Sequence, residues 1–205
     1  VLAKYQEVTR LSASQLSSEM KTYTDLLTEI ANTSDLRQSN PVRQQGALQN
    51  FSNRLVIFDG GAVVLDNFGV LVAALPERSD ELGHDWSDRA YFRQIVHAPR
   101  PVFSNILPDG PQQTEVIVAA VPVLGDQGEL IGILAGMFRM GAREVSSFYG
   151  GIVKQRIGES GSTYIVDANG RVIYHQNSSQ IGTNVSDSII VLAAKKEDVG
   201  AIQTS

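Results

Sequence analysis

The residues best suited to bind a small molecule fall in one short stretch, His84-Asp-Trp-Ser-Asp-Arg-Ala-Tyr91. The guanidinium of Arg89 offers a planar fork of donors that fits a carboxylate with two hydrogen bonds. Tyr91 follows two residues later, so on an extended or turning segment it faces the same side. His84 adds a second donor and Trp86 an apolar wall, which together are typical of small-ligand pockets. The stretch predicts a binding site for a small polar ligand.

A second interpretation of the same stretch needs no ligand. Arg89 could pair with Asp85 or Asp88 and simply fasten a loop. Trp86 could fill the core instead of forming a pocket wall, although the loop that carries it is predicted to be exposed. From the residues alone, the ligand-binding and structural interpretations are equally good.

No other group of residues indicates catalysis or metal binding. Asp85 and Asp88 lie near His84 and could act as general acid and base, but no nucleophile with a triad partner accompanies them. Glycine-rich phosphate motifs are absent, and the three histidines lack carboxylates at ligand spacing. Asp167-Ala-Asn-Gly170 lacks the later ligands of a calcium loop and predicts a hairpin turn. We therefore predict no catalytic residue, no metal ion and no cofactor.

The composition narrows the class of protein further. The 205 residues carry 17 Lys and Arg against 22 Asp and Glu, and this net charge of −5 argues against a nucleic-acid surface. The absence of cysteine excludes disulfides and thiolate chemistry, and it is compatible with an oxidising compartment. The longest apolar runs, 116–124 and 130–138, are about half of the ~20 residues that a membrane span needs. Because Val1 begins within a helical pattern, we expect a piece of a longer protein.

The predicted elements alternate between helices and antiparallel strands. Apolar residues at spacings of three and four predict a helix over about 2–30, which serves either core packing or a dimer seam. A second helix runs from Pro41 to about Asn53, with Asn40 as its cap. Turn residues separate the predicted strands, which are 55–58, 62–65, 102–106, 115–124, 130–139, 163–166 and 171–175.

Three of these strands, 102–106, 115–124 and 130–139, follow one another through short turns and predict an antiparallel meander. Ser104 and the face of Val118 and Ala120 would form the sheet floor of the binding site. A further helical pattern covers 141–160.

The chain contains an internal repeat. The strand–turn–strand around Asp59-Gly-Gly matches the one around Asp167-Ala-Asn-Gly170, and Leu82-Gly-His-Asp-Trp-Ser-Asp matches Ile181-Gly-Thr-Asn-Val-Ser-Asp in the same order. The second copy lacks a meander of its own. It also has apolar residues where the first has Arg89 and aromatic residues, so a polar ligand would bind the first copy.

The string Gly83-His-Asp-Trp-Ser-Asp-Arg-Ala-Tyr-Phe92 resembles the double Cache sensor family, and Tyr164–His175 with Ile181-Gly182 resembles its second module. The resemblance implies an α+β fold with a long N-terminal helix and two PAS-like modules. It also implies an extracytoplasmic (periplasmic or extracellular) domain between two membrane helices of a bacterial receptor. In this family small ligands usually bind in the membrane-distal module, which is the first copy here.

The sequence departs from the amino-acid-binding members of this family. They have a Tyr, an Arg, a Trp-Tyr pair and a later Asp that holds the ligand's amine, and these positions read His84, Arg89, Tyr91, Phe92 and Met137 here. Without that Asp, nothing obvious compensates a buried ammonium. We therefore expect a small carboxylate or another anionic or polar metabolite as the ligand.

These arguments combine into one prediction. Residues 1–50 form two helices, 51–140 the membrane-distal ligand-binding module, and 141–205 a truncated membrane-proximal module. The fragment is a non-catalytic sensing domain of a signalling receptor, most simply a histidine kinase, and forms a homodimer through its first helix. The alternatives are a ligand-free structural or dimerisation module, or a domain of a chemoreceptor or diguanylate cyclase. The predicted ligand-binding residues are Arg89, Tyr91, His84, Trp86, Ser104 and Met137.

Overall fold

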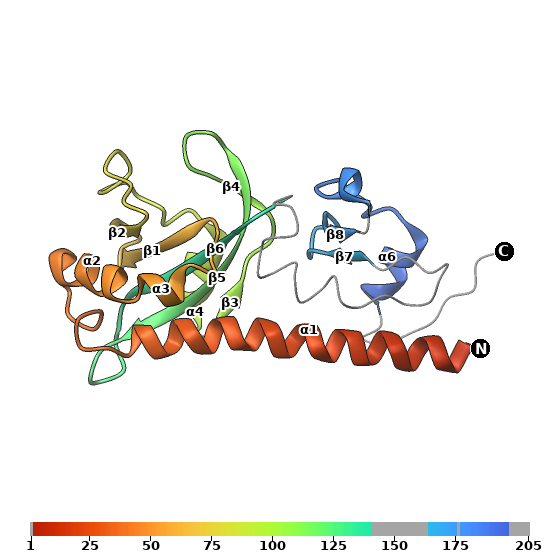
Figure 1. The fold of residues 1–205 in the computed structure, drawn as a ribbon, viewed down its shortest axis with the longest axis horizontal. Coiled ribbons are helices and arrows are strands. Elements are labelled where there is room, and N and C mark those ends of the chain that lie inside the picture. The colour runs from red at the N-terminus through yellow and green to blue at the C-terminus, as the bar shows by residue number, and fades with distance from the viewer. Residues whose placement is uncertain (1, 141–163, 176, 197–205) are drawn as a thin grey trace. The chain divides into compact units, whose positions relative to one another are not determined.

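The computed structural model describes residues 2–140, 164–175 and 177–196 (Figure 1). Contacts divide the chain into one unit of residues 21–139 and another of residues 1–20 with 140–205. The predicted α+β fold with a long N-terminal helix and antiparallel sheets is confirmed. The described elements are α1 Leu2–Ala31, α2 Pro41–Asn50, α3 Ser52–Leu55, β1 Gly61–Asp66, β2 Leu71–Leu75, α4 Ala90–His97, β3 Val102–Phe103, β4 Leu107–Asp109, β5 Thr114–Leu124, β6 Leu130–Arg139, β7 Tyr164–Val166, β8 Val172–His175, η1 Ser178–Gln180 and α6 Ile189–Ala194.

The first two helices begin and end close to where their patterns predict. The Asn40 side chain accepts hydrogen bonds from the backbone N–H groups of Val42 at 3.1 Å and Arg43 at 3.2 Å, so it caps α2 as expected. Pro41 occupies the first turn of this helix, where a missing N–H costs nothing. The helix predicted over 141–160 lies outside the described residues. Within the part of the chain that the structure describes, no helix is long and apolar enough to cross a membrane.

The larger sheet has the strand order β2-β1-β6-β5-β3, and β4 pairs with β5 beyond this path. All its pairings are antiparallel, and the predicted meander is confirmed in the adjacency of β3, β5 and β6. At the β2 edge, the Gln45 side-chain amide donates to the carbonyl of Ala74 and accepts from its N–H, both at 3.0 Å. This amide satisfies backbone groups that an edge strand otherwise leaves open.

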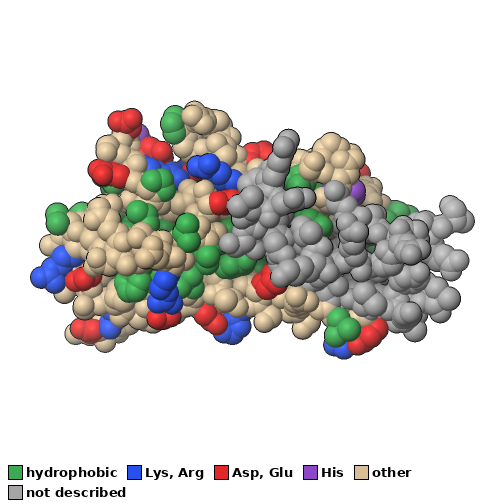
Figure 2. Space-filling model, viewed as in Figure 1, with side chains coloured by type: hydrophobic (Ala, Val, Ile, Leu, Met, Phe, Trp, Pro, Cys, Tyr) green, Lys and Arg blue, Asp and Glu red, His purple; other side chains and the backbone are tan. Residues whose placement is uncertain are grey.

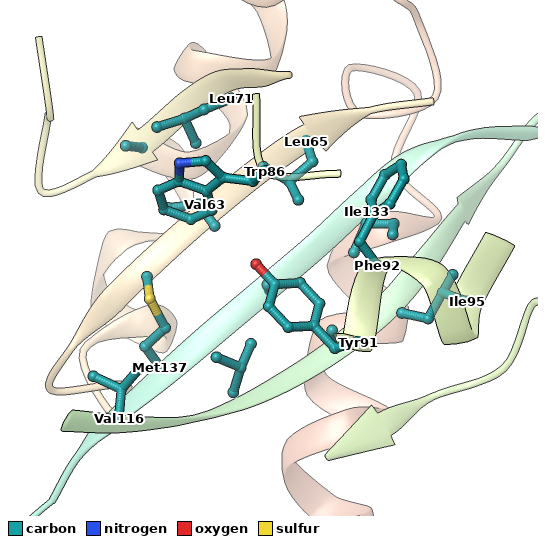
Figure 3. Packing of buried hydrophobic residues seen from close by; sticks show 14 residues of the cluster. Val63, Leu65, Leu71, Trp86, Tyr91, Phe92, Ile95, Val116, Ile133 and Met137 are labelled. Carbon is teal, nitrogen blue, oxygen red and sulfur yellow. The ribbon is translucent and has the colours of Figure 1, made fainter. Parts of the chain in front are cut away.

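The two faces of this sheet bury different groups because successive side chains of a strand point to opposite faces. On one face, Phe138 of β6 contacts Tyr23 of α1 and Phe58, with ring centroids 4.9 and 5.0 Å apart. On the other face, the neighbouring residue Met137 lies in a cluster with Trp86 and the α4 residues (Figure 3). Strand β6 therefore lies directly between α1 and the face that carries the predicted site.

Two hairpins, one in each unit, are built alike. The Oδ1 atoms of Asp66 and Asp167 each accept hydrogen bonds from the amides two and four residues further on, all at 2.9 Å. Each turn ends in a glycine with positive φ, +93° at Gly69 and +83° at Gly170, the left-handed region that glycine adopts without a steric penalty.

The segment after each hairpin folds back on it in the same way. The N–H of Gly83 donates to the carbonyl of Leu71, and the N–H of Gly182 donates to the carbonyl of Val172, both at 2.8 Å. These shared hydrogen bonds confirm the internal repeat that the sequence predicts.

The predicted register of the repeat is wrong in the first copy. Asp167 corresponds to Asp66 and not to Asp59, and the strand predicted over 55–58 is the end of a helix followed by a turn. Leu55 and Phe58 are buried whereas Val56 is 73% exposed. Burial at a spacing of three is the pattern of a helical turn and not of a strand, in which every second residue is buried.

Substitution of Gly69 tests the close approach in the first hairpin. A Cβ there would lie 2.7 Å from the Cα of Ser87, whereas a Cβ on Gly128 would meet nothing within 4 Å. Both glycines have positive φ, so alanine at either position costs about 1 kcal/mol of backbone strain. We expect Gly69→Ala to lower the free energy of unfolding by at least ~1 kcal/mol more than Gly128→Ala in urea titrations. Equal losses would contradict the close packing.

Candidate functional site

Arg89 lies in a partly buried ionic cluster on the α4 side of the sheet. Its Nη1 atom is 3.4 Å from Oδ1 of Asp109, and its guanidinium stacks on the Trp86 ring, 3.6 Å from the ring centroid. A cation this close to an indole face is attracted by the ring quadrupole. The structural interpretation expected Arg89 to pair with Asp85 or Asp88. The carboxylate that Arg89 faces is instead that of Asp109. A backbone hydrogen bond from Ser87 instead lowers the pKa of Asp85.

A second arginine completes this cluster. Nη2 of Arg78 lies 2.8 Å from Oδ2 of Asp109 and donates to the carbonyl of Gly60 at 3.1 Å. Nη1 of Arg78 lies 3.6 Å from Glu81, is buried, and has no hydrogen-bond partner among the residues that the structure describes. Burial by itself lowers the pKa of Arg78, but Asp109 and Glu81 outweigh that effect and raise it above its usual value. Arg78 is therefore a fixed positive charge with donor capacity to spare.

A pocket of about 210 Å³ opens beside Arg78 and Asp109. The charged side chains of Glu81 and Arg139 also line it, as does the turn 110–112. In the space-filling view, acidic and basic side chains meet between the two loops that project above β2 and β4 (Figure 2). Two arginines, Arg78 and Arg139, and two carboxylates, Glu81 and Asp109, line the pocket. The positive charge of Arg89 does not line it but lies behind Asp109.

The pocket thus lies on an antiparallel sheet, in a chain that begins with a long helix. The family model dCache_1, described as Cache domain, matches residues 1–204. The chain belongs to the Cache domain family. The family resemblance predicted from residues 83–92 and from the second hairpin is confirmed.

Solved structures share the fold of this Cache domain. The ligand-binding domain of the Pseudomonas aeruginosa PAO1 amino acid chemoreceptor PctB in complex with L-Gln has 16% identity and a TM-score of 0.68, over 91% of this chain and 73% of that one. The sensor domain of the V. cholerae histidine kinase DctB has 15% identity and a TM-score of 0.61, over 96% and 75%.

An extracellular ligand binding receptor from Desulfohalobium retbaense DSM5692 has 19% identity and a TM-score of 0.62 over 95% of this chain. The Cache domain spans 33% of the length of that receptor. Among curated proteins, no sequence matches the chain. At these identities the structural likeness shows the fold alone.

The structure brings Trp86, Tyr91 and Met137 of the predicted site together in the Cache domain. All three are buried on the same side of the sheet, and the Tyr91 hydroxyl points in the direction of Trp86 (Figure 3). Val118 and Ala120, the predicted floor of the site, belong to the same buried cluster. The loop that carries Trp86 is exposed at His84, Asp85 and Asp88, but Trp86 itself is buried, with only 5% exposed.

Tyr91 lies on a helix and not on the extended or turning segment that the sequence suggested. Arg89 caps α4 with extended backbone, and Tyr91 is the second helical residue. The buried residues of α4 are Tyr91, Phe92 and Ile95. They follow one another at spacings of one and three residues, which is typical of a helix and could have been recognised in the sequence.

The other two predicted residues lie apart from the ionic cluster. His84 is exposed and does not line the pocket; its backbone carbonyl accepts a hydrogen bond from the N–H of Leu71. The Ser104 hydroxyl accepts a hydrogen bond from the N–H of Val118 at 2.9 Å, so it continues the pairing of β3 with β5.

Sequence reasoning missed Arg78, Glu81 and Asp109. Asp109 precedes a glycine and reads as an ordinary turn residue, and Arg78 and Glu81 belong to a polar stretch that is typical of a solvated loop. Two carboxylates that the sequence did not indicate, Asp109 and Glu81, line the pocket, and both already face Arg78.

Tyr91 is expected to lower the stability of the Cache domain at high pH. Burial raises the pKa of the Tyr91 hydroxyl well above its usual value, and the charge of Arg89 offsets part of that effect. Since the unfolded chain then loses this proton first, the contribution of Tyr91 is complete below pH ~10 and is lost as the pH rises toward the folded-state pKa. We expect the free energy of unfolding to fall less steeply above pH 10 in Tyr91→Phe, by up to ~1.4 kcal/mol per pH unit. Urea titrations from pH 8 to 11.5 measure both slopes, and equal slopes would contradict the burial effect.

Proposed function

We propose that residues 21–139 bind a small carboxylate in the pocket beside Arg78 and Asp109, and that the chain is the extracytoplasmic sensing part of a bacterial signalling receptor. The observation that carries this proposal is the cluster of the partly buried Arg78 and Arg89 on the buried Asp109, at the wall of an open pocket. Two partly buried guanidiniums on one buried carboxylate add little stability by themselves, because desolvation offsets much of the attraction.

The electrostatics and size of the pocket favour a small anion. Nη1 of Arg78 has no hydrogen-bond partner, whereas both oxygens of Asp109 already face arginines. A ligand acceptor could take this donor once Arg78 turns toward the pocket, while a ligand ammonium would have to compete for Asp109. The 210 Å³ volume is smaller than the roughly 300–1,000 Å³ of pockets for drug-sized ligands, which suits a metabolite of a few carbons.

An amino acid is the second candidate ligand. The carboxylates of Glu81 and Asp109 at the pocket could hold an amine while Arg78 holds the carboxylate. The structures of PctB with L-Gln and of the Pseudomonas fluorescens chemoreceptor CtaA with L-valine support this class by analogy of fold.

The receptor type is proposed on the same grounds. A histidine kinase parent is supported by the likeness to DctB, and a chemoreceptor parent by the likeness to PctB. In either parent the domain would be non-catalytic, held beside a membrane, and dimeric through α1. Ligand binding would shift the segment 66–94 against the sheet, and it could do so only through a difference in affinity between the two states.

Thermal unfolding of the isolated chain with matched ligand series tests this function. Small carboxylates, their neutral amides and the corresponding amines are compared by calorimetry and melting temperature. We expect carboxylates to stabilise the fold, by about 2.7 kcal/mol at one hundred times the dissociation constant, and the amides to have no effect. Binding of amines without carboxylates would overturn the proposed ligand class. No binding by any series would favour the ligand-free structural module.

A further inference from the structure

The Asp109 carboxylate is held as a ligand carboxylate would be held. Its Oδ2 atom lies 2.8 Å from Arg78 and its Oδ1 atom 3.4 Å from Arg89, so one carboxylate bridges two guanidiniums. Only 6% of its side chain is exposed. Asp109 therefore takes up guanidinium N–H groups with which both arginines could otherwise bind an external anion.

The strand that carries Asp109 is weakly attached to the rest of the unit. Strand β4 has three residues, Leu107, Pro108 and Asp109, and among the described strands it pairs with β5 alone. The turn that follows contains two left-handed residues, Gly110 with φ +65° and Gln113 with φ +52°. Part of this turn lines the pocket. The two ion pairs of Asp109 therefore connect β4, which forms part of the pocket wall, to the segment that carries Arg78 and Arg89.

We propose that Asp109 is a specificity-determining residue that takes the anion position between Arg78 and Arg89, so that a ligand carboxylate binds both arginines only by displacing it. The inference rests on the proposed function for the class of ligand. Asp109 sets a threshold, because an external acceptor must bind the arginines better than a carboxylate that is already tethered there. A neutral acceptor binds a guanidinium more weakly than a carboxylate does, so it would not displace Asp109. Displacement also releases β4 and the turn 110–113 from the arginines.

The substitution Asp109→Asn tests the competition, because it keeps the shape of the side chain and removes its charge. Acetate is the probe, and acetamide is its neutral counterpart of the same shape. We expect acetate to bind Asp109→Asn about tenfold more tightly than the unchanged protein, within the roughly 5- to 150-fold range of typical coupling between sites. Acetamide should bind neither. Asp126→Asn is the matched control: it removes a carboxylate that is 94% exposed and pairs with Arg37, so acetate affinity should stay unchanged. Equal or weaker acetate binding by Asp109→Asn would overturn the proposal.

Hydrogen exchange of the unchanged protein gives a second test, which decides the matter should Asp109→Asn not fold. Saturating acetate should speed the exchange of amides in 107–116, because displaced Asp109 no longer holds β4. Unchanged or slower exchange would overturn the proposal. The proposed function fails separately: if Asp109→Asn gains acetate affinity while the unchanged protein responds to no carboxylate series, the competition stands and the sensing function does not. If the unchanged protein responds to carboxylates but Asp109→Asn gains no acetate affinity, the sensing function stands and the competition does not.

Discussion

Replacing Arg89 with alanine is expected to weaken carboxylate binding by roughly thirtyfold, equivalent to about 2 kcal/mol for the loss of hydrogen bonds to a charged group. The ligand-induced rise in melting temperature should largely disappear. The fold should persist, because Asp109 keeps its 2.8 Å contact with Arg78. Calorimetry and thermal unfolding of Arg89→Ala, each with and without the ligand, measure the two effects separately.

Arg54→Ala is the matched control for this experiment. Arg54 is also paired with a carboxylate, Glu29 at 2.6 Å, and its guanidinium also lies over an aromatic ring, that of Phe51. It is more exposed than Arg89, and its partner Glu29 does not line the pocket, whereas Asp109, the partner of Arg89, does. We expect its ligand response to match that of the unchanged protein. An unaltered response in Arg89→Ala would remove Arg89 from the site.

The second large effect is expected from Phe138→Ala, which should lower the free energy of unfolding by about 3–5 kcal/mol. Phe138 is fully buried, and its ring packs against those of Tyr23 and Phe58. Truncation leaves a cavity at the point where α1 meets the sheet, and it also removes edge-on aromatic contacts. Because small domains are stable by only about 5–15 kcal/mol, this loss is a large fraction of the total. Urea titrations measure it through the transition midpoint.

Phe68→Ala provides the comparison for that substitution. Phe68 lies at the tip of the first hairpin and is 74% exposed, so the same truncation removes little packing. We expect a change within about 0.5 kcal/mol. A loss at Phe68 as large as that at Phe138 would show that the aromatic packing on α1 is not the source of stability.

Local features of the fold were predictable because neighbouring residues produce them. The length of α1 follows from apolar spacing, and the start of α2 follows from Asn40 and Pro41, whose effects act within one helical turn. The Asp-x-x-Gly turn at 167–170 is equally local. The same logic failed at 55–58, where a short apolar run fits a strand or a helix end until its burial is known.

The candidate site likewise has one part that the sequence identifies and another that only the tertiary structure brings in. Arg89, Trp86 and Tyr91 lie within six residues, so their types and spacing identify them as one group without any structure. The residues that decide their chemistry, Arg78 and Asp109, come from a loop and from a three-residue strand. No local pattern links these segments. They meet because β4 pairs with β5 while the chain from β2 to α4 crosses the same face of the sheet, and such long-range pairing depends on the whole core and not on local spacing.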